Sequence, residues 1–354
     1  MDSRERVKLA MRRRVPDRVP RFDHFWADAR SDLLAQAGAH PDADVADVFD
    51  FDIRGLGFDD SARLDRVTVR EDEREIVYRD NWGITIRHFK EEQTTGEHIA
   101  FAVTDPAAWR EQYRERYRFR RDRINFKRAK VLYDYFRRTG RYVAFMALEP
   151  FEATWKKCGP TEHLAAYIED PDWIRDMYAV HTELCEAAFA EFRAAGIEFD
   201  GAWFWADIAY KNTSMVSPAA YRELLQPFHR RLCAMVHAAG GEVVFHSDGN
   251  LHGLLPDIIA SGFDCLQPIE VKAGMDVREL KKSYGDRLAF MGNIDARLYQ
   301  ENNLQGLERE LREKISAAKV GGGYVYHSDH SVPPGVTLET YRRVLEWVDH
   351  YGRY

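Results

Sequence analysis

Residues 199–250 have the sequence FDGAWFWADIAYKNTSMVSPAAYRELLQPFHRRLCAMVHAAGGEVVFHSDGN, which contains one complete strand–helix–strand unit. The apolar, aromatic run Phe199–Ala206 predicts a buried strand. Ser217-Pro218 supplies an N-cap and a first-turn proline for a helix that stops at the glycine pair 240–241. The run Glu242–His246 predicts the next strand, so the unit is a right-handed βαβ crossover in a parallel sheet.

The same alternation continues through the last two-thirds of the chain. Further strands are predicted at Tyr142–Glu149, Cys265–Glu270, Arg287–Gly292 and Tyr324–His327. Further helices are predicted at Thr161–Glu169, Trp173–Ala195, Leu251–Ala260, Met275–Tyr284, Leu304–Lys319 and Leu338–Tyr351. Two earlier runs, Val19–Trp26 and Phe49–Gly57, bring the strands to eight. We therefore predict an α/β fold, a (β/α)8 TIM barrel that spans residues 1–354 as a single domain. A doubly wound open sheet is the alternative, but no GxGxxG turn follows any strand.

Residues at about 60–130 depart from the barrel pattern. Arg74–Lys90 has two β-rich runs around Asn81-Trp82-Gly83, which predicts a hairpin. Asp105–Arg128 is dense in Arg and Glu and has aromatic residues at helical spacing. We predict that this part of the N-terminal region is a hairpin and helix inserted on the barrel, as a cap or a dimer contact.

Composition excludes several classes of function. The 354 residues include 51 Lys and Arg against 58 Asp and Glu, a net charge of −7 that lacks the basic footprint of a nucleic-acid-binding protein. No apolar run approaches the roughly 18 residues of a membrane span. The four cysteines form no CxxC pair, which argues against a disulfide framework and predicts a cytoplasmic protein.

Polar side chains follow the predicted strands, and the active sites of (β/α)8 enzymes lie at the carboxyl ends of their strands. The residues at these ends are Asp23, His24, Asp52, Arg54, Glu149, Asp207, His246, Asp248, Glu270, Asn293, Asp295, His327, Asp329 and His330. The loop after Asp207 adds Tyr210 and Lys211, which suit an anion, and Trp155 is expected in the core or in a pocket wall.

The string His246-Ser247-Asp248 is the sharpest local feature. Residues two apart in a strand face the same way, so His246 and Asp248 can point at one place. A histidine and a carboxylate can hold a metal ion or form an acid–base pair. An alternative stays open, in which His246 bonds a buried backbone group and Asp248 caps the next helix.

Several strings resemble the uroporphyrinogen decarboxylase superfamily. They are PFEATWKKCG, SPAAYRELLQPFHRRL, HSDGNLHGLLPDIIASGFDCLQPIE, YGDRLAFMGNID and YHSDHSVPPGVTLETYRRVLE. The resemblance implies a TIM barrel and one of two chemistries. One is the cofactor-free decarboxylation of uroporphyrinogen, and the other is methyl transfer by zinc-dependent enzymes similar to the methylcobalamin:coenzyme M methyltransferases.

The decarboxylase pattern is present only in part. Its arginine-rich RQAGR stretch is absent after Pro16-Asp17-Arg18, and its tyrosine falls near Trp155 or Lys156. Its pyrrole-binding aspartate matches Asp52, and its late histidine matches His330. The alternative function is thus a decarboxylase of a carboxylated, porphyrin-type substrate, in which Arg54 and Lys211 hold carboxylates.

The methyltransferase pattern matches better and differs in an informative way. In that branch a His-x-Cys pair and a later Cys bind zinc, and the matching positions here are His246, Asp248 and His330. The resemblance therefore implies a divalent metal ion, Zn²⁺ first, although harder ligands also suit iron or manganese. Because Asp replaces a thiolate, we expect an oxygen- or amine-linked methyl substrate rather than a coenzyme thiol.

Our leading hypothesis is a methyltransferase or demethylase component that passes a methyl group between a small substrate and a corrinoid. The DxHxxG string of a cobalamin-binding module is missing, so the corrinoid is expected on a separate partner protein. The family also implies a homodimer, and a non-catalytic binding barrel is the third hypothesis. The predicted catalytic residues are Glu149, Asp207, His246, Asp248 and His330, and those for substrate binding are Asp52, Arg54, Trp155, Tyr210, Lys211, Glu270 and Asn293.

Overall fold

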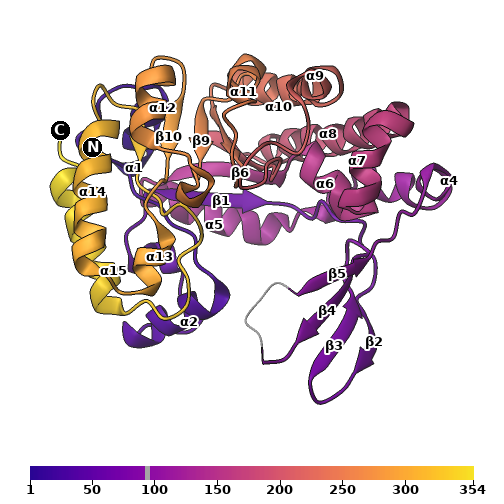
Figure 1. The fold of residues 1–354 in the computed structure, drawn as a ribbon, viewed down its shortest axis with the longest axis horizontal. Helices are drawn as coiled ribbons and strands as arrows, with labels where there is room; N and C mark the ends of the chain where they lie inside the picture. The colour runs from indigo at the N-terminus through magenta and orange to yellow at the C-terminus, as the bar shows by residue number, and fades with distance from the viewer. Residues whose placement is uncertain (92–95) are drawn as a thin grey trace.

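A computed structural model describes residues 1–91 and 96–354 of the chain (Figure 1). Its main element is a curled, seven-stranded parallel sheet in which each strand pairs with the next one along the chain. The strands are β1 (Ile53–Gly57), β6 (Tyr142–Leu148), β7 (Gly201–Trp205), β8 (Glu242–His246), β9 (Cys265–Gln267), β10 (Ala289–Met291) and β11 (Tyr324–Val325). The predicted α/β class is confirmed.

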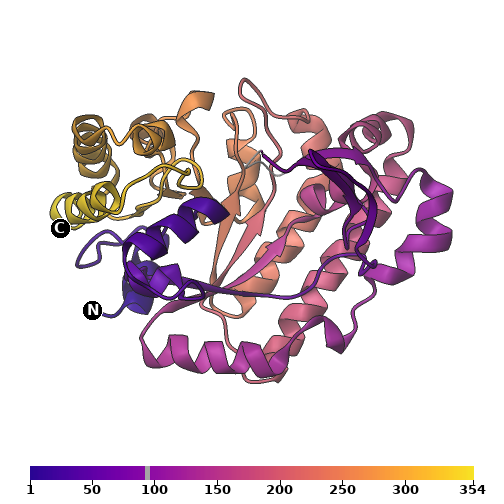
Figure 2. The ribbon, with the colours of Figure 1, turned by 90° about the horizontal axis from the view of Figure 1, so that it is seen from below.

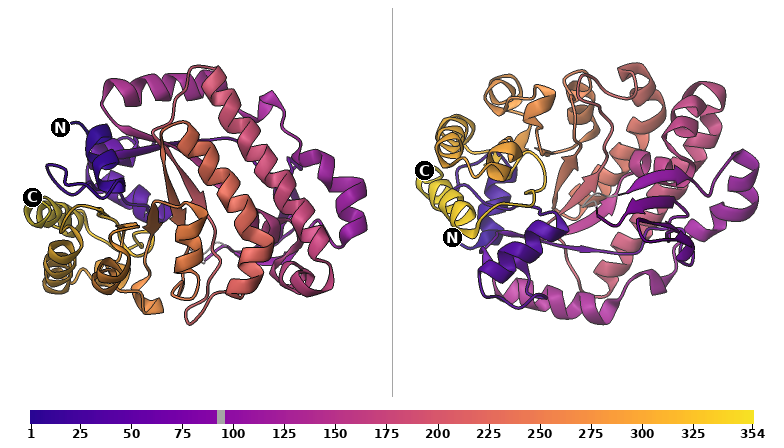
Figure 3. Two further views of the ribbon diagram at one scale, coloured as in Figure 1. Left: turned by 90° about the horizontal axis from the view of Figure 1, so that it is seen from above. Right: turned by 60° about the horizontal axis from the view of Figure 1, so that its bottom comes forward.

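Helices surround this sheet, and the longest ones lie along its outer face (Figure 3). The helices before β7 are α1 (Ser3–Met11), α2 (Ala27–Gln36), α3 (Val45–Val48), α4 (Pro106–Ala108), α5 (Phe126–Arg138), α6 (Pro150–Cys158), α7 (Pro160–Glu169) and α8 (Pro171–Ala194). Those after β7 are α9 (Pro218–Ala220), α10 (Gln226–Ala238), α11 (Leu255–Ser261), α12 (Val277–Tyr284), α13 (Ala296–Gln300), α14 (Leu304–Ala318) and α15 (Leu338–Tyr351). The two chain ends lie on the same side of the molecule (Figure 2).

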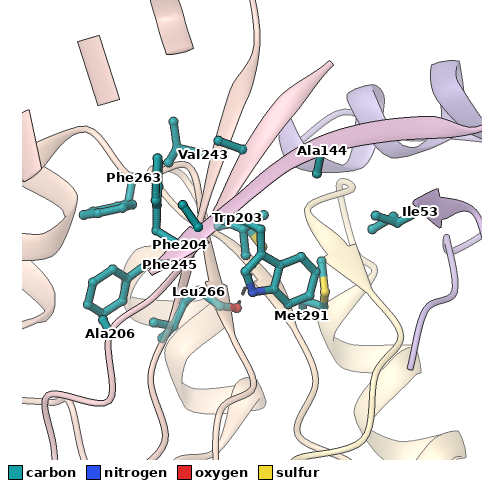
Figure 4. Packing of buried hydrophobic residues seen from close by; sticks show 14 of the residues in the cluster. Ile53, Ala144, Trp203, Phe204, Ala206, Val243, Phe245, Phe263, Leu266 and Met291 are labelled. Atoms are coloured by element: carbon teal, nitrogen blue, oxygen red, sulfur yellow. Dashed lines mark hydrogen bonds between the residues drawn. The ribbon is translucent and has the colours of Figure 1, made fainter. Parts of the chain in front are cut away.

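The strands are apolar on both faces because both faces are buried. Trp203 and Phe204 are neighbours in β7 and both are fully buried, yet they point to opposite sides of the sheet (Figure 4). Trp203 lies inside the curl near Met291, whereas Phe204 lies on the side of Phe245 and Phe263. The rings of Phe245 and Phe263 pack edge to face with centroids 4.6 Å apart.

The predicted eighth strand, Val19–Trp26, is instead an extended segment that pairs at single residues. Arg21 bridges Tyr326, and the backbone N–H of Asp52 donates to the carbonyl of Arg21 at 2.9 Å. Pro20 has no N–H to give to a ladder. The Asp23 carboxylate adds side-chain bonds to this edge, because it accepts from Ser328 N–H at 2.8 Å and from two tyrosine hydroxyls.

Other differences from the predictions are local. The predicted helix at 105–128 is four short turns, namely α4 and the stretches Trp109–Tyr113, Arg114–Tyr117 and Arg121–Arg123. Helix α11 begins at Leu255 rather than Leu251, because Pro256 is tolerated only in a first turn. The strand predicted from Phe49 begins at Ile53, after Asp50 with its positive φ of 52°.

The inserted region contains a second, antiparallel sheet that projects from the main one (Figure 1). Its strands are β2 (Val67–Glu71), β3 (Glu75–Arg79), β4 (Thr85–Phe89) and β5 (Glu97–Ala100). The predicted hairpin at 74–90 is confirmed as β3 and β4, with Gly83 at φ 90° in the turn. Residues 92–95 of the predicted insertion lie outside the described residues, and the single-domain assignment stays a prediction.

The model offers no candidate for a bilayer-crossing helix in the part of the chain that it describes.

Asp52 ties the amino-terminal segments to the first strand. It is fully buried directly before β1 and accepts hydrogen bonds from Ser3 Oγ at 2.7 Å, Arg6 at 2.8 Å and Arg18 at 2.9 Å. It also accepts from the backbone N–H of Arg21 at 2.8 Å. One carboxylate therefore holds α1 and the 18–21 segment against the edge of the sheet.

We predict that Asp52→Asn destabilises the fold by about 3 kcal/mol, because the buried carboxylate is the counter-charge of Arg18 and one of the two carboxylates that pair with Arg6. Urea unfolding at an unchanged m value measures this loss. Asp50→Asn is the matched control, since the Asp50 side chain is 56% exposed and its ion pairs with Arg21 and Arg141 should contribute less than about 1 kcal/mol. Equal midpoints for the two variants would contradict the assignment.

Candidate active site

Three ionisable side chains meet at the carboxyl ends of β7 and β8. His246 is the last residue of β8, Asp248 follows it by two, and Asp207 comes two residues after β7. Each side chain offers one atom suited to a metal ion, and these atoms lie within 4.8 Å of one another. The sequence predicted all three as catalytic residues, and the fold brings them together.

The contacts within this group are close. Asp207 Oδ1 lies 3.5 Å from His246 Nε2 and accepts the backbone N–H of Asp248 at 3.0 Å. The other ring nitrogen of His246, Nδ1, contacts Gln267 Oε1 at the end of β9. His246 therefore has one ring nitrogen directed at a carboxylate and the other at an amide oxygen.

The three side chains change one another's pKa values. Burial alone would lower the pKa of His246, but the carboxylates of Asp207 and Asp248 outweigh it and raise this pKa to about 9. Burial likewise opposes ionisation of Asp207, yet the hydrogen bond and charge of His246 hold its pKa below the ordinary value. Burial raises the pKa of Asp248, and Asp207 adds to that rise. The two carboxylates thus differ strongly in acidity.

Asp248 also has an unsatisfied oxygen. Its Oδ1 is buried and has no hydrogen-bond partner among the described residues, whereas its Oδ2 lies 3.5 Å from His330 Nε2. An unpaired carboxylate oxygen in a buried place costs free energy unless a cation or a donor reaches it. Together with the nitrogen of His246 and the second carboxylate, this donor set fits a divalent ion.

His330 is half-buried, and its ring stacks on Trp26 with centroids 5.7 Å apart. It contacts Asp248 but does not belong to the compact group of donors, in which Asp207 is the third member. The predicted metal set of His246, Asp248 and His330 thus has two members in that group.

A cavity of about 280 Å³ opens beside the carboxylates. Asp207 and Asp248 form part of its wall, and the rest is chiefly apolar, with Phe151, Trp155, Leu164 and Met215 among the lining residues. Trp155 lies in this wall, where its ring faces that of His98 on β5 at 5.9 Å. The second sheet therefore reaches the substrate side of the site.

Glu149, a predicted catalytic residue, is fully buried beneath the cavity wall. It caps α6 by accepting the backbone N–H groups of Phe151 at 2.8 Å and Glu152 at 2.6 Å. It also pairs with His229 Nε2 at 2.6 Å, and His229 Nδ1 contacts Tyr221 at 2.9 Å. These contacts hold α6, and with it Phe151 and Trp155, in place.

Four predicted substrate residues lie at carboxyl ends but outside the cavity lining. Glu270 accepts the N–H of Gly249 at 2.8 Å and so shapes the loop that carries Asp248. Asn293 is fully buried and bonds the backbone of Ile269 and Met275 at 2.7 Å. Tyr210 and Lys211 are exposed on the loop after β7.

Asp52 and Arg54 lie far from this position in the fold, at the amino-terminal end of β1. Arg54 is buried and donates to the carbonyl of Phe51 at 2.7 Å and to Asp47 at 2.6 Å. Asp52 is occupied by the amino-terminal arginines described above. The fold therefore separates these two predicted residues from His246, because the strand starts later than the sequence pattern indicated.

Two residues of the site escaped the sequence analysis. Glu152 is buried with an unpaired Oε2, and burial together with the charge of Asp207 raises its pKa to about 7. Glu152 lies in PFEATWKKCG, one of the strings that resemble the family, and this position could have identified it as a site residue. Gln267 sits in an apolar strand as the one uncharged partner of His246, and no sequence signal separated it from an ordinary buried amide.

Comparisons with known proteins agree with this fold. Among solved structures, a methyltransferase from Methanosarcina mazei covers 99% of both chains with a TM-score of 0.65 at 15% identity, which is a likeness of fold. A psychrophilic family 10 endo-β-1,4-xylanase (TM-score 0.36, 11% identity, 60% of this chain and 73% of that one) is too distant to carry an argument. The same is true of xylanase B from Clostridium stercorarium F9, which has a TM-score of 0.35 at 11% identity and covers 66% of this chain and 86% of that one.

No curated protein sequence matches the chain. A family model described as uroporphyrinogen decarboxylase (URO-D) matches residues 156–351, which is more than half of the chain and includes Asp207, His246, Asp248 and His330. The chain therefore belongs to the uroporphyrinogen decarboxylase family.

Proposed function

We propose that this protein is a metal-dependent methyltransferase or demethylase component of the URO-D family. It passes a methyl group between a small substrate and a corrinoid on a separate protein. The observation that carries the proposal is the group of Asp207, His246 and Asp248, with one buried unpaired carboxylate oxygen, at the edge of an apolar cavity.

The three side chains of this group would hold the ion. A nitrogen and two carboxylate oxygens suit Zn²⁺ and also the harder Fe²⁺ and Mn²⁺. When bound, such an ion supplies Lewis acidity that polarises an oxygen or nitrogen of the substrate. Asp207 keeps His246 Nε2 directed into the group, and Glu270 fixes the loop of Asp248 through Gly249.

The cavity gives the substrate its place. Its apolar wall excludes water and favours an uncharged methyl-bearing body, while the carboxylate edge receives the polar atom that carries the methyl group. For demethylation a corrinoid would supply the reduced cobalt that takes the methyl group, and the substrate atom would keep the electron pair of the broken bond. His330, beside Asp248, is the proposed proton donor to it.

The fold supports this branch of the family over the decarboxylase alternative. That alternative needs Asp52 at the pyrrole-type ring and Arg54 at a substrate carboxylate, but both side chains are paired within the protein at the amino end of β1. The likeness in fold to a methyltransferase points the same way.

The proposal also covers the architecture. We propose that the curled sheet is an eight-unit TIM barrel in one domain, with the 19–26 segment as its eighth unit. We further propose that the chain forms the homodimer that its family implies.

We predict that the purified protein binds one equivalent of a divalent ion, and that His246→Ala and Asp248→Asn each abolish stoichiometric binding. Metal analysis after dialysis, with Co²⁺ as a spectroscopic probe, measures this. His237→Ala is the matched control, because His237 is a surface histidine paired with Asp264 and should leave the metal content unchanged. Substoichiometric metal that persists in the His246 variant would rule out the site.

The identity of the third ligand can be tested separately. We predict that Asp207→Asn lowers metal affinity strongly while His330→Gln retains the ion, because only Asp207 belongs to the compact group of donors. Dissociation constants from competition with a chromophoric chelator distinguish the two. The reverse order would restore His330 as the third ligand and would assign Asp207 to the orientation of His246.

We predict that Trp155→Leu raises KM for a methyl donor by about ten-fold or more with little change in kcat or metal content, because it removes aromatic surface worth about 1.5–3 kcal/mol on burial. The assay follows methylation of free cob(I)alamin by a panel of methoxy and methylamino compounds. Trp82→Leu in the second sheet is the control and should leave KM unchanged. An unchanged KM in the Trp155 variant would exclude this cavity as the substrate site.

A further inference from the structure

A row of polar side chains crosses the interior of the curled sheet from His246 to the segment 19–26. His246 Nδ1 contacts Gln267 Oε1, and Gln267 Nε2 lies 3.4 Å from His327 Nε2. His327 Nε2 is in turn 3.0 Å from His24 Nδ1. Gln267 and His327 are almost fully buried. This row of side chains therefore begins at the proposed metal site and ends on the opposite wall of the fold.

The contacts of His327 decide which of its two ring nitrogens carries the proton, and this in turn orients the other side chains of the row. His327 Nδ1 lies 2.5 Å from the backbone carbonyl of Ser328 and 3.6 Å from Asp23 Oδ1. Both neighbours accept only, so His327 carries its proton on Nδ1 and its lone pair on Nε2. The groups that face this lone pair must donate, and they are His24 Nδ1–H and the amide NH₂ of Gln267.

The orientation of Gln267 follows from that donation. With its NH₂ toward His327, its Oε1 faces His246, which must present Nδ1–H to it. A rotated amide would place Oε1 against the lone pair of His327 and NH₂ against the Nδ1–H of His246. Both contacts would be repulsive, so the amide has one stable orientation.

We propose that Gln267 is a positioning residue that fixes the Nδ1–H tautomer and the ring orientation of His246, and that His327 and His24 lock Gln267 in place. In the neutral form of the ring, which is the form that binds a metal ion, this tautomer leaves the Nε2 lone pair of His246 on the side of Asp207. This inference rests on the proposed function insofar as that lone pair is the one offered to the ion. A partner on the second ring nitrogen is the usual means by which a protein orients a ligating histidine.

A neutral amide is the group that suits this position. It accepts from one histidine and donates to the other, which a carboxylate or a hydrocarbon side chain does not do. The surrounding rings keep water from taking over either bond, because Trp203 lies 5.3 Å from the ring of His24 and 6.4 Å from that of His327. Gln267 therefore holds the Nδ1 side of the His246 ring, while Asp207 faces the Nε2 side.

The test compares Gln267→Leu, Gln267→Glu and Gln226→Leu in the full-length protein. Gln226 is the matched control, a buried glutamine on α10 that bonds the carbonyl of Asp257 at 3.0 Å. Zn²⁺ affinity, measured by chelator competition, should fall by about 10–100-fold in Gln267→Leu and stay within a few-fold in Gln226→Leu. Gln267→Glu keeps the acceptor for His246 and should retain most of the affinity.

A second readout does not need the metal. Nitrogen-15 spectra of the metal-free protein above pH 9, where the ring of His246 is neutral, report which ring nitrogen carries the proton. The wild type should show Nδ1–H, with the signal assigned by its loss in His246→Gln, and Gln267→Leu should populate Nε2–H. His327→Leu should do so partly, because it frees the amide to rotate.

The outcomes separate the two proposals. An Nε2–H tautomer in the wild type, or an unchanged tautomer and Zn²⁺ affinity in Gln267→Leu, overturns the positioning role. If the wild type binds no Zn²⁺ yet shows an Nδ1–H tautomer that Gln267→Leu abolishes, the positioning role stands and the proposed metal-dependent function falls. An equal loss of affinity in Gln226→Leu would trace the effect to general destabilisation and would also overturn it.

Discussion

Two buried carboxylates join the edges of the curled sheet, and the rest of the structure depends on them. Seven strands leave β1 and β11 without a common neighbour, and the 19–26 segment lies between them with few ladder bonds. Asp23 fastens this segment to β11 through Ser328, and Asp52 fastens it to β1 through Arg18 and the N–H of Arg21. These side chains add to the backbone hydrogen bonds that the segment makes with Tyr326, Asp52 and Val332. The carboxyl ends of β7, β8 and β9 lie together because the three strands pair in parallel.

The site gathers negative charge in a partly buried place. Asp207, Asp248 and Glu152 are held within one region, and His246 is the cation that balances them. Burial is the main cause of the raised pKa values of Asp248 and Glu152, and repulsion from Asp207 adds to it. A divalent cation would relieve this repulsion and would satisfy the orphan oxygen of Asp248. The unfavourable electrostatics of these three carboxylates and the fit of the group to a metal ion are therefore two aspects of one arrangement.

The sequence predicted what depends on local pattern. The strand–helix alternation after residue 140 and the hairpin at 74–90 follow from periodicity and turn residues, and both are present. The meeting of Asp207, His246 and Asp248 follows from the rule that parallel strands present their carboxyl ends together. The 19–26 segment differs from the predicted strand because its backbone pairs only at isolated bridges, which the apolar pattern did not indicate. Asp52 and Arg54 were misjudged because β1 starts at Ile53, which leaves both of them at its beginning.

Gln267 and the network behind it depend on contacts between distant segments, which no single sequence reveals. The other parts of the site come from two separate regions of the chain. The metal-type donors come from the loops after β7 and β8, whereas the cavity wall near Trp155 is backed by His98 from the inserted sheet. Chemistry and selectivity are therefore encoded in separate stretches of the chain. Substitutions in the inserted sheet that displace His98 would therefore alter the setting of Trp155, and with it the shape of the cavity, while Asp207, His246 and Asp248 stay in place.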